Sequence, residues 1–417
     1  MLTPEFIAQL GNAKSTSLPS ATGLSFSTHR LKPGQAFFAL PGNATHGILY
    51  AEQALAKGAA FIVSDKPHPK GLVVTDPVAL LLELGKYGRE NLKGNVIGIS
   101  GSAGKTSTKT MVAAVLDIPS TPGNLNTPLA LAETLINAYS SGQHNLVLEL
   151  GIDHLGEMDT LVNLVKPTHA VLTLIAPSHL EGLKTLENVA KEKAKLLWAA
   201  KRRLASSQTL PFISEVTEVQ SYGLKSANYS GHYQAGRLIY KNHAINLPAL
   251  GQAMATNALA ALALAEIFNI PLDLAGQRLE HCKLEPGRLQ VINLGTLKLI
   301  DDSYNSSPAA VKEALSVLSE CPEPHSAILG DMLELGSHSA DYHFEIGKET
   351  RHLNHVVAIG KMSKYIAEAN PKAIYFSTVE EALPYLQHLT LHGSVLVKAS
   401  RGMKFERCIA ALREVLA

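Results

Sequence analysis

The ten residues 98–107, Gly-Ile-Ser-Gly-Ser-Ala-Gly-Lys-Thr-Ser, constrain the fold of this chain most. They follow a short, mostly apolar run at 95–97 and lead into a helix-like stretch at 108–116. A glycine loop between a strand and a helix cradles phosphate, because its backbone N–H groups converge on phosphate oxygens and the helix N-terminus adds partial positive charge. The spacing G-x-x-G-K-T is two residues shorter than G-x-x-x-x-G-K-[ST]. A surface turn that contains Gly-Lys-Thr by chance is the alternative, and the flanking strand and helix argue against it.

The loop predicts a nucleotide site with a metal ion. Lys105 is placed to reach the terminal phosphates, and Thr106 to hold Mg²⁺. The residues expected to bind the nucleotide here are Gly101, Ser102, Ala103, Gly104, Lys105, Thr106 and Ser107.

Composition is that of an ordinary globular enzyme. The length of 417 residues fits about three domains. The net charge of +1 gives no general attraction to nucleic acid or to an anionic membrane, so neither is expected as a partner. The three scattered cysteines argue against a disulfide framework or a zinc site. The first residues lack the basic and apolar regions of a secretory signal, and no apolar run approaches the roughly 20 residues of a membrane span. We therefore expect a cytoplasmic protein.

The sequence predicts an α/β fold in three domains. Residues 1–93 form a small N-terminal α/β domain, with strands near 36–40 and 60–63 around a helix at 51–57. Residues 94–286 form the central phosphate-loop domain, and Pro286-Gly287 makes a plausible hinge. Residues 287–417 form a Rossmann-like C-terminal domain.

Strands and helices follow one another in the second and third domains. The central domain is expected to have strands at 146–150 and 170–174 and helices at 185–200 and 252–268. The C-terminal domain alternates strand and helix, which predicts a mostly parallel sheet wrapped by helices. The segments are 297–301, 308–318, 327–330, 343–350, 356–360, 395–398 and 405–416.

Three polar residues of the central domain lie at the ends of predicted strands, where open α/β sheets bind ligands, or on the helix that follows. Glu149 ends an apolar strand, and a buried carboxylate there needs a cation such as Mg²⁺, a salt bridge or a helix cap. His179 follows the next strand, although a lone histidine is more often structural. Lys193 lies on the helix after it, between Lys191 and Lys195, where a solvated basic face is the plain alternative.

Three polar loops follow strands of the C-terminal domain, at 301–308, 330–336 and 398–402. Asp301, Asp302 and Asn305 suit contacts to a ribose or a base, whereas a helix cap and turn would explain 306–308 alone. Because the three loops lie on one edge of one sheet, we expect a shared cleft.

Taken together, these motifs resemble those of the Mur ligase family, the ATP-dependent amide-forming enzymes of peptidoglycan assembly. The resemblance covers essentially the whole chain and is greatest to the branch that adds D-alanyl-D-alanine. It rests on the short phosphate loop and on the segments 33–40, 58–59, 123–126, 302–308, 330–336 and 397–401.

The resemblance implies roles for individual residues. Lys105, His179 and Lys193 would be catalytic, and Lys193 aligns with a lysine that is carbamylated in the family. Mg²⁺ would be held by Thr106, Glu149, His179 and carbamylated Lys193. The nucleotide would also meet Asn257, Arg288, Asp302 and Asn305. The substrates would meet Asn124, Asn126, Lys398, Ser400 and Arg401.

The resemblance also implies a reaction. The carboxylate of a UDP-linked muramoyl peptide, held by the N-terminal domain, would attack the γ-phosphate of ATP, and the amine of D-Ala-D-Ala, bound by the C-terminal domain, would then attack the acyl phosphate. The cofactors are ATP and Mg²⁺, and a monomer is expected. A diaminopimelate- or lysine-adding relative and a folylpolyglutamate-type ligase share the ATP core. A nucleotide-dependent switch or transport ATPase is the alternative from another class.

Overall fold

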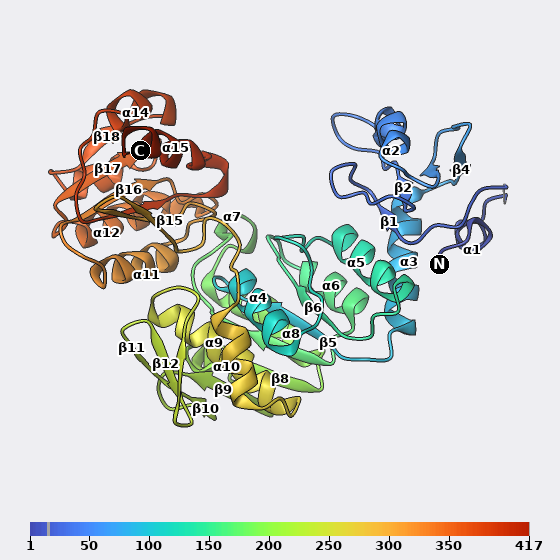
Figure 1. Cartoon of the computed structure of the whole chain (residues 1–417), viewed down its shortest axis with the longest axis horizontal. Coiled ribbons are helices and arrows are strands. Elements are labelled where there is room, and N and C mark those ends of the chain that lie inside the picture. The colour runs from blue at the N-terminus through green and yellow to red at the C-terminus, as the bar shows by residue number, and fades with distance from the viewer. Residues whose placement is uncertain (15–16, 417) are drawn as a thin grey trace.

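Three sheet-containing units follow one another along the chain, with the N-terminal and C-terminal units on opposite sides of the central one (Figure 1). The structure is a computed structural model that describes residues 1–14 and 17–416. The mixed α/β fold with mostly parallel sheets confirms the predicted fold class. The predicted boundaries at 93/94 and 286/287 fall between elements, after α3 and before β14. Within the described residues, no helix is long and apolar enough to cross a bilayer.

The N-terminal unit is a four-stranded parallel sheet with short helices, in the strand order β1-β2-β3-β4. Its last helix, α3, leads into the central unit; Asp76 caps this helix by accepting from the backbone N–H groups of Val78 and Ala79. The elements are α1 (Pro4–Leu10), β1 (Leu24–Ser25), β2 (Ala36–Phe38), η1 (Gly47–Tyr50), α2 (Ala51–Ala56), β3 (Ile62–Ser64), β4 (Gly71–Val73) and α3 (Pro77–Asn91).

The N-terminal unit is joined to helix α5 (Pro128–Ser140) of the central unit by polar and apolar contacts. The side-chain amide of Asn137 donates to the carbonyl of Leu24 and accepts from its N–H, both at 2.8 Å, as a neighbouring strand would. Arg30 pairs with Glu133 at 2.8 Å. A single hydrophobic cluster continues from the N-terminal sheet through α3 and α5 to one face of the central sheet. The two units therefore share a core.

Close packing of α3 on α5 yields a stability prediction. A Cβ on Gly85 would lie 2.5 Å from the Cα and Cβ atoms of Ala132, so the helices touch through their backbones. We expect Gly85→Val to destabilise the protein by about 2 kcal/mol, because overpacking a core typically costs about 1–3 kcal/mol. The measurement is the thermal unfolding midpoint, with Glu83→Ala on the exposed face of α3 as control. An unchanged midpoint for the valine variant would show that the helices can separate there at no cost.

The central sheet is parallel, in the order β10-β9-β8-β7-β5-β6. Its core strand β5 is buried at every residue because helices cover both faces, as parallel sheets require. The elements are β5 (Val96–Ser100), α4 (Lys105–Leu116), β6 (Leu146–Glu149), α6 (Glu157–Val165), β7 (His169–Leu172), α7 (Leu180–Leu183), α8 (Leu186–Trp198), β8 (Arg202–Ser206), η2 (Ser207–Phe212), β9 (Val219–Gly223) and β10 (Tyr229–Ser230).

A small antiparallel sheet and two helices complete the central unit. The sheet consists of β11 (His232–Gln234), β12 (Arg237–Tyr240) and β13 (His243–Asn246), and it was not predicted from the sequence. Helix α9 (Gln252–Ile267) is apolar on all sides and is almost wholly buried, between α4, α10 (Leu272–Glu280) and the large sheet. Its N-terminus contacts α11, where the N–H of Ala253 donates to Glu313, and Asn257 in its second turn lies beside Gly104 of the phosphate loop.

The C-terminal sheet has the order β14-β15-β19-β16-β17-β18 and is parallel except for the hairpin strand β14. Separate hydrophobic clusters fill its two faces. The elements are β14 (Gln290–Leu294), β15 (Leu297–Asp302), α11 (Pro308–Ser319), β16 (His325–Gly330), η3 (Gly336–His338), α12 (Ser339–Glu349), β17 (His355–Ile359), α13 (Lys364–Ala369), β18 (Ile374–Phe376), α14 (Val379–Leu386), β19 (Ser394–Lys398), η4 (Arg401–Met403) and α15 (Glu406–Leu416).

Candidate active site

The phosphate loop connects β5 to α4 in a conformation that needs glycine. Gly101 and Gly104 have φ angles of +151° and +80°. A Cβ on Gly101 would lie 2.0 Å from Thr173 Oγ1, and one on Gly104 would lie 2.8 Å from Asn257 Oδ1. Lys105 folds back over the loop and donates from Nζ to the carbonyl of Gly101 at 2.8 Å. The loop thus leaves the N-terminus of α4 open, with its free backbone donors available to an anion.

Hydrogen bonds join the phosphate loop to the segment that carries His179. Ser102 donates from Oγ to the carbonyl of Ala176 at 2.7 Å and accepts from Ser178 Oγ at 3.0 Å. These bonds hold the segment after β7 beside the phosphate loop, and His179 therefore lies at the edge of the same site.

Glu149, at the end of β6, lies next to the phosphate loop and is 2% exposed. Thr106 donates from Oγ1 to its Oε2 at 2.8 Å, and Asn126 donates from Nδ2 to its Oε1 at 3.2 Å. Lys109 Nζ lies 3.8 Å from Oε2. The buried carboxylate thus has both a hydroxyl and a cation beside it, which offsets its desolvation.

Lys109 was missed by the sequence reasoning, which stopped at the Gly-Lys-Thr motif. Its ammonium is buried and donates to the carbonyls of Thr121, at 2.8 Å, and Gly123. Burial lowers the pKa of Lys109, whereas Glu149 acts in the opposite direction. Lys109 thereby connects α4 to the loop that presents Asn124 and Asn126. Its position four residues after Lys105, one helical turn further on, is the signal that could have found it.

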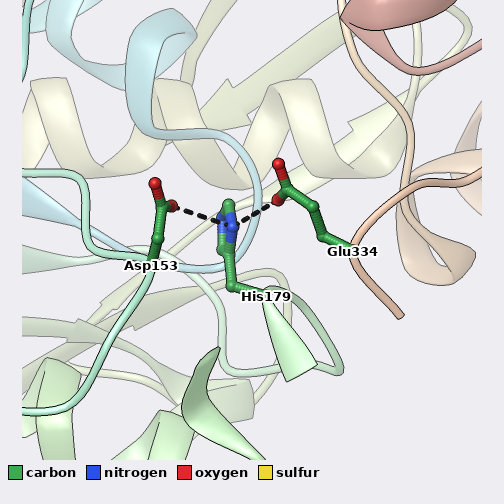
Figure 2. A group of neighbouring side chains, drawn as sticks. All are labelled: Asp153, His179 and Glu334. Carbon is green, nitrogen blue, oxygen red and sulfur yellow. Dashed lines mark ion pairs between the residues drawn. The ribbon is translucent and has the colours of Figure 1, made fainter. Parts of the chain in front are cut away.

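His179 meets two carboxylates, one from each side of the interface between the central and C-terminal units (Figure 2). Its Nδ1 lies 2.9 Å from Asp153 Oδ1 and 2.6 Å from Glu334 Oε2. Neither contact has the direction of a hydrogen bond from the ring nitrogen. Burial lowers the pKa of His179, but the two carboxylates outweigh burial and raise it above its usual value.

Asp153 and Glu334 were not among the residues predicted to form the site. Asp153 comes shortly after β6, and Glu334 lies in the loop after β16 that was singled out as polar. Glu334 has a φ angle of +65°, which is strained for a residue with a side chain, and its carbonyl accepts from the N–H of Glu181 at 3.3 Å. Two contacts of Glu334 therefore join the C-terminal unit to α7.

Three lysines of α8 have different surroundings. Lys191 is exposed, whereas Lys195 pairs with Asp159 at 2.6 Å and with Glu192 at 2.7 Å. Lys193 is fully buried, and its Nζ has no hydrogen-bond partner among the described residues. Burial and the neighbouring Lys105 lower the pKa of Lys193 well below its usual value. A buried amine without a partner is costly in either protonation state, so this nitrogen is a candidate for modification.

The polar loops of the C-terminal sheet meet as expected. Lys398 donates from Nζ to Asp302 Oδ2 at 2.5 Å and to the carbonyl of Asn305 at 2.8 Å. Ser400 donates from Oγ toward the carbonyl of Ser306 at 3.5 Å and accepts from the N–H of Leu333 at 2.9 Å. Asp302 also accepts from the N–H of Leu289 at 3.1 Å. Burial raises the pKa of the Asp302 carboxyl, and Lys398 opposes that shift.

One cavity of about 820 Å³ lies between the central and C-terminal units. Gly101 and Lys193 are not part of its wall, and Asn257 contributes to it from α9. The predicted site residues that line it are Ser102, Ala103, Gly104, Lys105, Thr106, Ser107, Asn124, Asn126, Glu149, His179, Asn257, Arg288, Asp302, Asn305, Lys398, Ser400 and Arg401.

The donor atoms of this cavity suit a hard divalent cation. Such ions prefer carboxylate, hydroxyl and carbonyl oxygens. The Thr106 hydroxyl and the Glu149 carboxylate lie together at the phosphate loop. A second group, Asp153, His179 and Glu334, brings donor atoms within 4.8 Å of one another. The first group offers Mg²⁺ oxygen donors alone, and the second offers it two carboxylates beside one imidazole nitrogen.

Comparison with known families shows which class of protein this fold and cavity belong to. The Mur ligase middle domain matches residues 99–265, and the Mur ligase glutamate ligase domain matches residues 287–401. Two relatives are named UDP-N-acetylmuramoyl-tripeptide--D-alanyl-D-alanine ligase. The one from Escherichia coli is 30% identical over 93% of this chain and 92% of its own length, and the one from Bacillus subtilis is 30% identical over 94% and 93%. The chain belongs to the Mur ligase family, in the branch of these relatives.

Solved structures agree with that placement. MurF from Acinetobacter baumannii is 26% identical, with a TM-score of 0.84 and 99% of both chains covered. MurF ligase from Thermotoga maritima, solved in complex with ADP, is 25% identical, with a TM-score of 0.81 over 94% of this chain and 97% of that one. The arrangement of all three units is thus shared with these ligases.

Proposed function

We propose that this chain is an ATP-dependent ligase that joins D-alanyl-D-alanine to a UDP-linked muramoyl tripeptide in peptidoglycan precursor synthesis. The observation that carries the proposal is that the phosphate loop and the polar loops of the C-terminal sheet line the same cavity. A nucleotide switch needs only the phosphate loop and would leave the other wall without a role. The relatives that match almost the full length carry this activity in their names.

The reaction has two steps. A carboxylate oxygen of the tripeptide attacks the γ-phosphorus of ATP, the bond from that phosphorus to the bridging oxygen breaks, and ADP leaves. The dipeptide amine then attacks the acyl carbon, loses a proton and expels inorganic phosphate. Lys105 and the N-terminus of α4 neutralise phosphate charge, and closure of the central and C-terminal units about Pro286-Gly287 would keep water from the acyl phosphate.

We assign Mg²⁺ to the two donor groups of the cavity. Thr106 and Glu149 would hold one ion, and His179 a second, with Asp153 and Glu334 close by. Lys193 lies outside the cavity wall and would serve the second ion only as the carbamate that the family resemblance implies. Bound Mg²⁺ would neutralise phosphate charge and polarise the transferred phosphoryl group. Asn257, Arg288, Asp302 and Asn305 would contact the nucleotide. The acceptor and the dipeptide would meet Asn124, Asn126, Lys398, Ser400 and Arg401.

We further propose that the protein works as a monomer in the cytoplasm. The cysteines Cys282, Cys321 and Cys408 are free thiols, the state that a reducing compartment maintains.

The acceptor preference can be tested by kinetics. We expect D-Ala-D-Ala to be a far better substrate than D-Ala, L-Lys or meso-diaminopimelate, because a site built to pair the groups of a dipeptide rejects ligands that leave those groups unpaired, by up to roughly 10⁴-fold. The measurement is kcat/KM for each amine in an ADP-release assay with UDP-linked muramoyl tripeptides. Equal use of a single amino acid would move the chain to another branch of the family, and ADP release that needs no acceptor would favour a switch ATPase.

A further inference from the structure

A tyrosine ring lies beside two arginines in the cavity. Tyr304 is in the loop between β15 and α11 and forms part of the cavity wall. The guanidinium carbon of Arg288 lies 4.2 Å from the ring centroid, and that of Arg401 lies 5.6 Å from it. Both distances are within the roughly 6 Å over which an aromatic face attracts a cation.

The backbone fixes this ring next to the segment that joins the central and C-terminal units. The N–H of Tyr304 donates to the carbonyl of Gly287 at 3.1 Å. Gly287 has a φ angle of +72°, and a Cβ on it would lie 3.1 Å from Tyr304 N and 3.3 Å from Tyr304 Cβ. Because the backbone at Gly287 lies this close to Tyr304, the next residue, Arg288, lies beside the tyrosine ring.

Arg288 has few other contacts that orient it. Its Nη2 donates to Thr106 Oγ1 in the phosphate loop at 2.8 Å, across the interface between the two units. Its Nε is buried without a hydrogen-bond partner among the described residues. Arg401 is mostly exposed, and its Nη1 lies 3.7 Å from Glu406. The ring is therefore the contact that the two guanidinium groups share.

The aromatic face of Tyr304, and not its hydroxyl, makes these contacts. The hydroxyl forms no hydrogen bond with another described residue. Burial raises the pKa of Tyr304, so the hydroxyl stays neutral at physiological pH. A phenylalanine ring would offer the cations a similar face.

We propose that Tyr304 is a positioning residue, whose ring holds Arg288 against the phosphate loop and keeps Arg401 at the cavity, so that both charges are in place before the phosphates arrive. The proposal rests on the proposed function and adds to it a residue that acts through others. Donors fixed in advance stabilise transferring phosphate without paying for reorganisation during the reaction.

The test compares Tyr304→Leu and Tyr304→Phe, each alone and combined with Arg288→Gln. We expect Tyr304→Leu to lower both kcat/KM for ATP and the affinity for a fluorescent ATP analogue on the order of 10-fold, and Tyr304→Phe to stay within about 2-fold of the parent. In the Arg288→Gln background, Tyr304→Leu should change either value less than about 3-fold, because only Arg401, the more distant of the two partners, is left for the ring to position. Tyr375→Leu, at an exposed tyrosine of β18, is the matched control.

Two results would overturn the proposal. A full loss from Tyr304→Leu in the Arg288→Gln background would mean that the ring does not act by holding Arg288, but on the nucleotide, on the loop itself or through Arg401 alone. A loss with Tyr304→Phe as large as with Tyr304→Leu would assign the role to the hydroxyl. Circular dichroism checks folding, and Tyr304→Met supplies a second non-aromatic variant if leucine unfolds the protein. The proposed function would fail if the parent enzyme released no ADP with any muramoyl peptide. Binding of the fluorescent ATP analogue needs no acceptor, so this measurement would still decide the role of Tyr304.

Discussion

Replacing Lys105 by alanine is expected to abolish ADP formation while the protein stays folded. Lys105 lies at the start of α4, and its ammonium has only the carbonyl of Gly101 as a hydrogen-bond partner among the described residues. Phosphate oxygens can take over that ammonium with a modest shift of the side chain. Loss of one such charge on a transferring phosphate costs on the order of 10² to 10³ in rate.

The measurement is ADP release under saturating substrates, with circular dichroism as the check on folding. Lys201→Ala, an exposed lysine of the same unit, is the control for a general charge effect. Near-normal turnover by folded Lys105→Ala would show that Lys105 and its loop are not needed for phosphate transfer.

Substitution of Lys193 is expected to have the second large effect on activity. We predict that this lysine carries a carbamate in the active enzyme, because its nitrogen is buried and unpartnered among the described residues and has a strongly lowered pKa. An uncharged amine is the form that reacts with CO₂, and the product carries a negative charge that Lys105 and a divalent cation can balance. Lys193→Ala should therefore be nearly inactive.

Addition of a short carboxylic acid should restore part of the activity of Lys193→Ala, because the acid can occupy the space of the lost carbamate. Lys191→Ala, two residues away on the exposed side of α8, should behave as the parent enzyme. High-resolution electron density without the modification, together with no rescue by formate or acetate, would make Lys193 a structural lysine.

Local patterns predicted the fold class and the elements that flank the phosphate loop and the polar loops, but not α3, α5, α6, β8, β9 or α10. The phosphate loop, the strands before each polar loop and the apolar helix α9 all follow from hydrophobic runs and glycine positions within a few residues. The antiparallel strands β11 to β13 were missed, since each is only three or four residues long and its sequence lacks a clear alternation of polar and apolar residues. These segments are strands because β12 pairs with β11 on one side and with β13 on the other, which the side-chain pattern alone does not indicate.

The site was harder to predict because it depends on contacts between distant segments. The carboxylates of Asp153 and Glu334 are 181 residues apart in the sequence and meet only at His179, where two units touch. Apart from the family resemblance, nothing in the sequence distinguishes Lys193 from Lys191, because the difference between them is burial, which depends on how α8 packs. The roles of the predicted residues remain proposals, although the cavity brings most of them together.

The hydrophobic cluster that continues from the N-terminal sheet through α3 and α5 affects how this enzyme could be recombined with its relatives. An exchange of the first 93 residues alone would separate α3 from α5, so that Gly85 would come from one parent protein and its contact Ala132 from the other. The C-terminal sheet, which has its own clusters on both faces, is the more interchangeable module. Chimaeras that exchange the N-terminal sheet should therefore carry α5 together with it as one block.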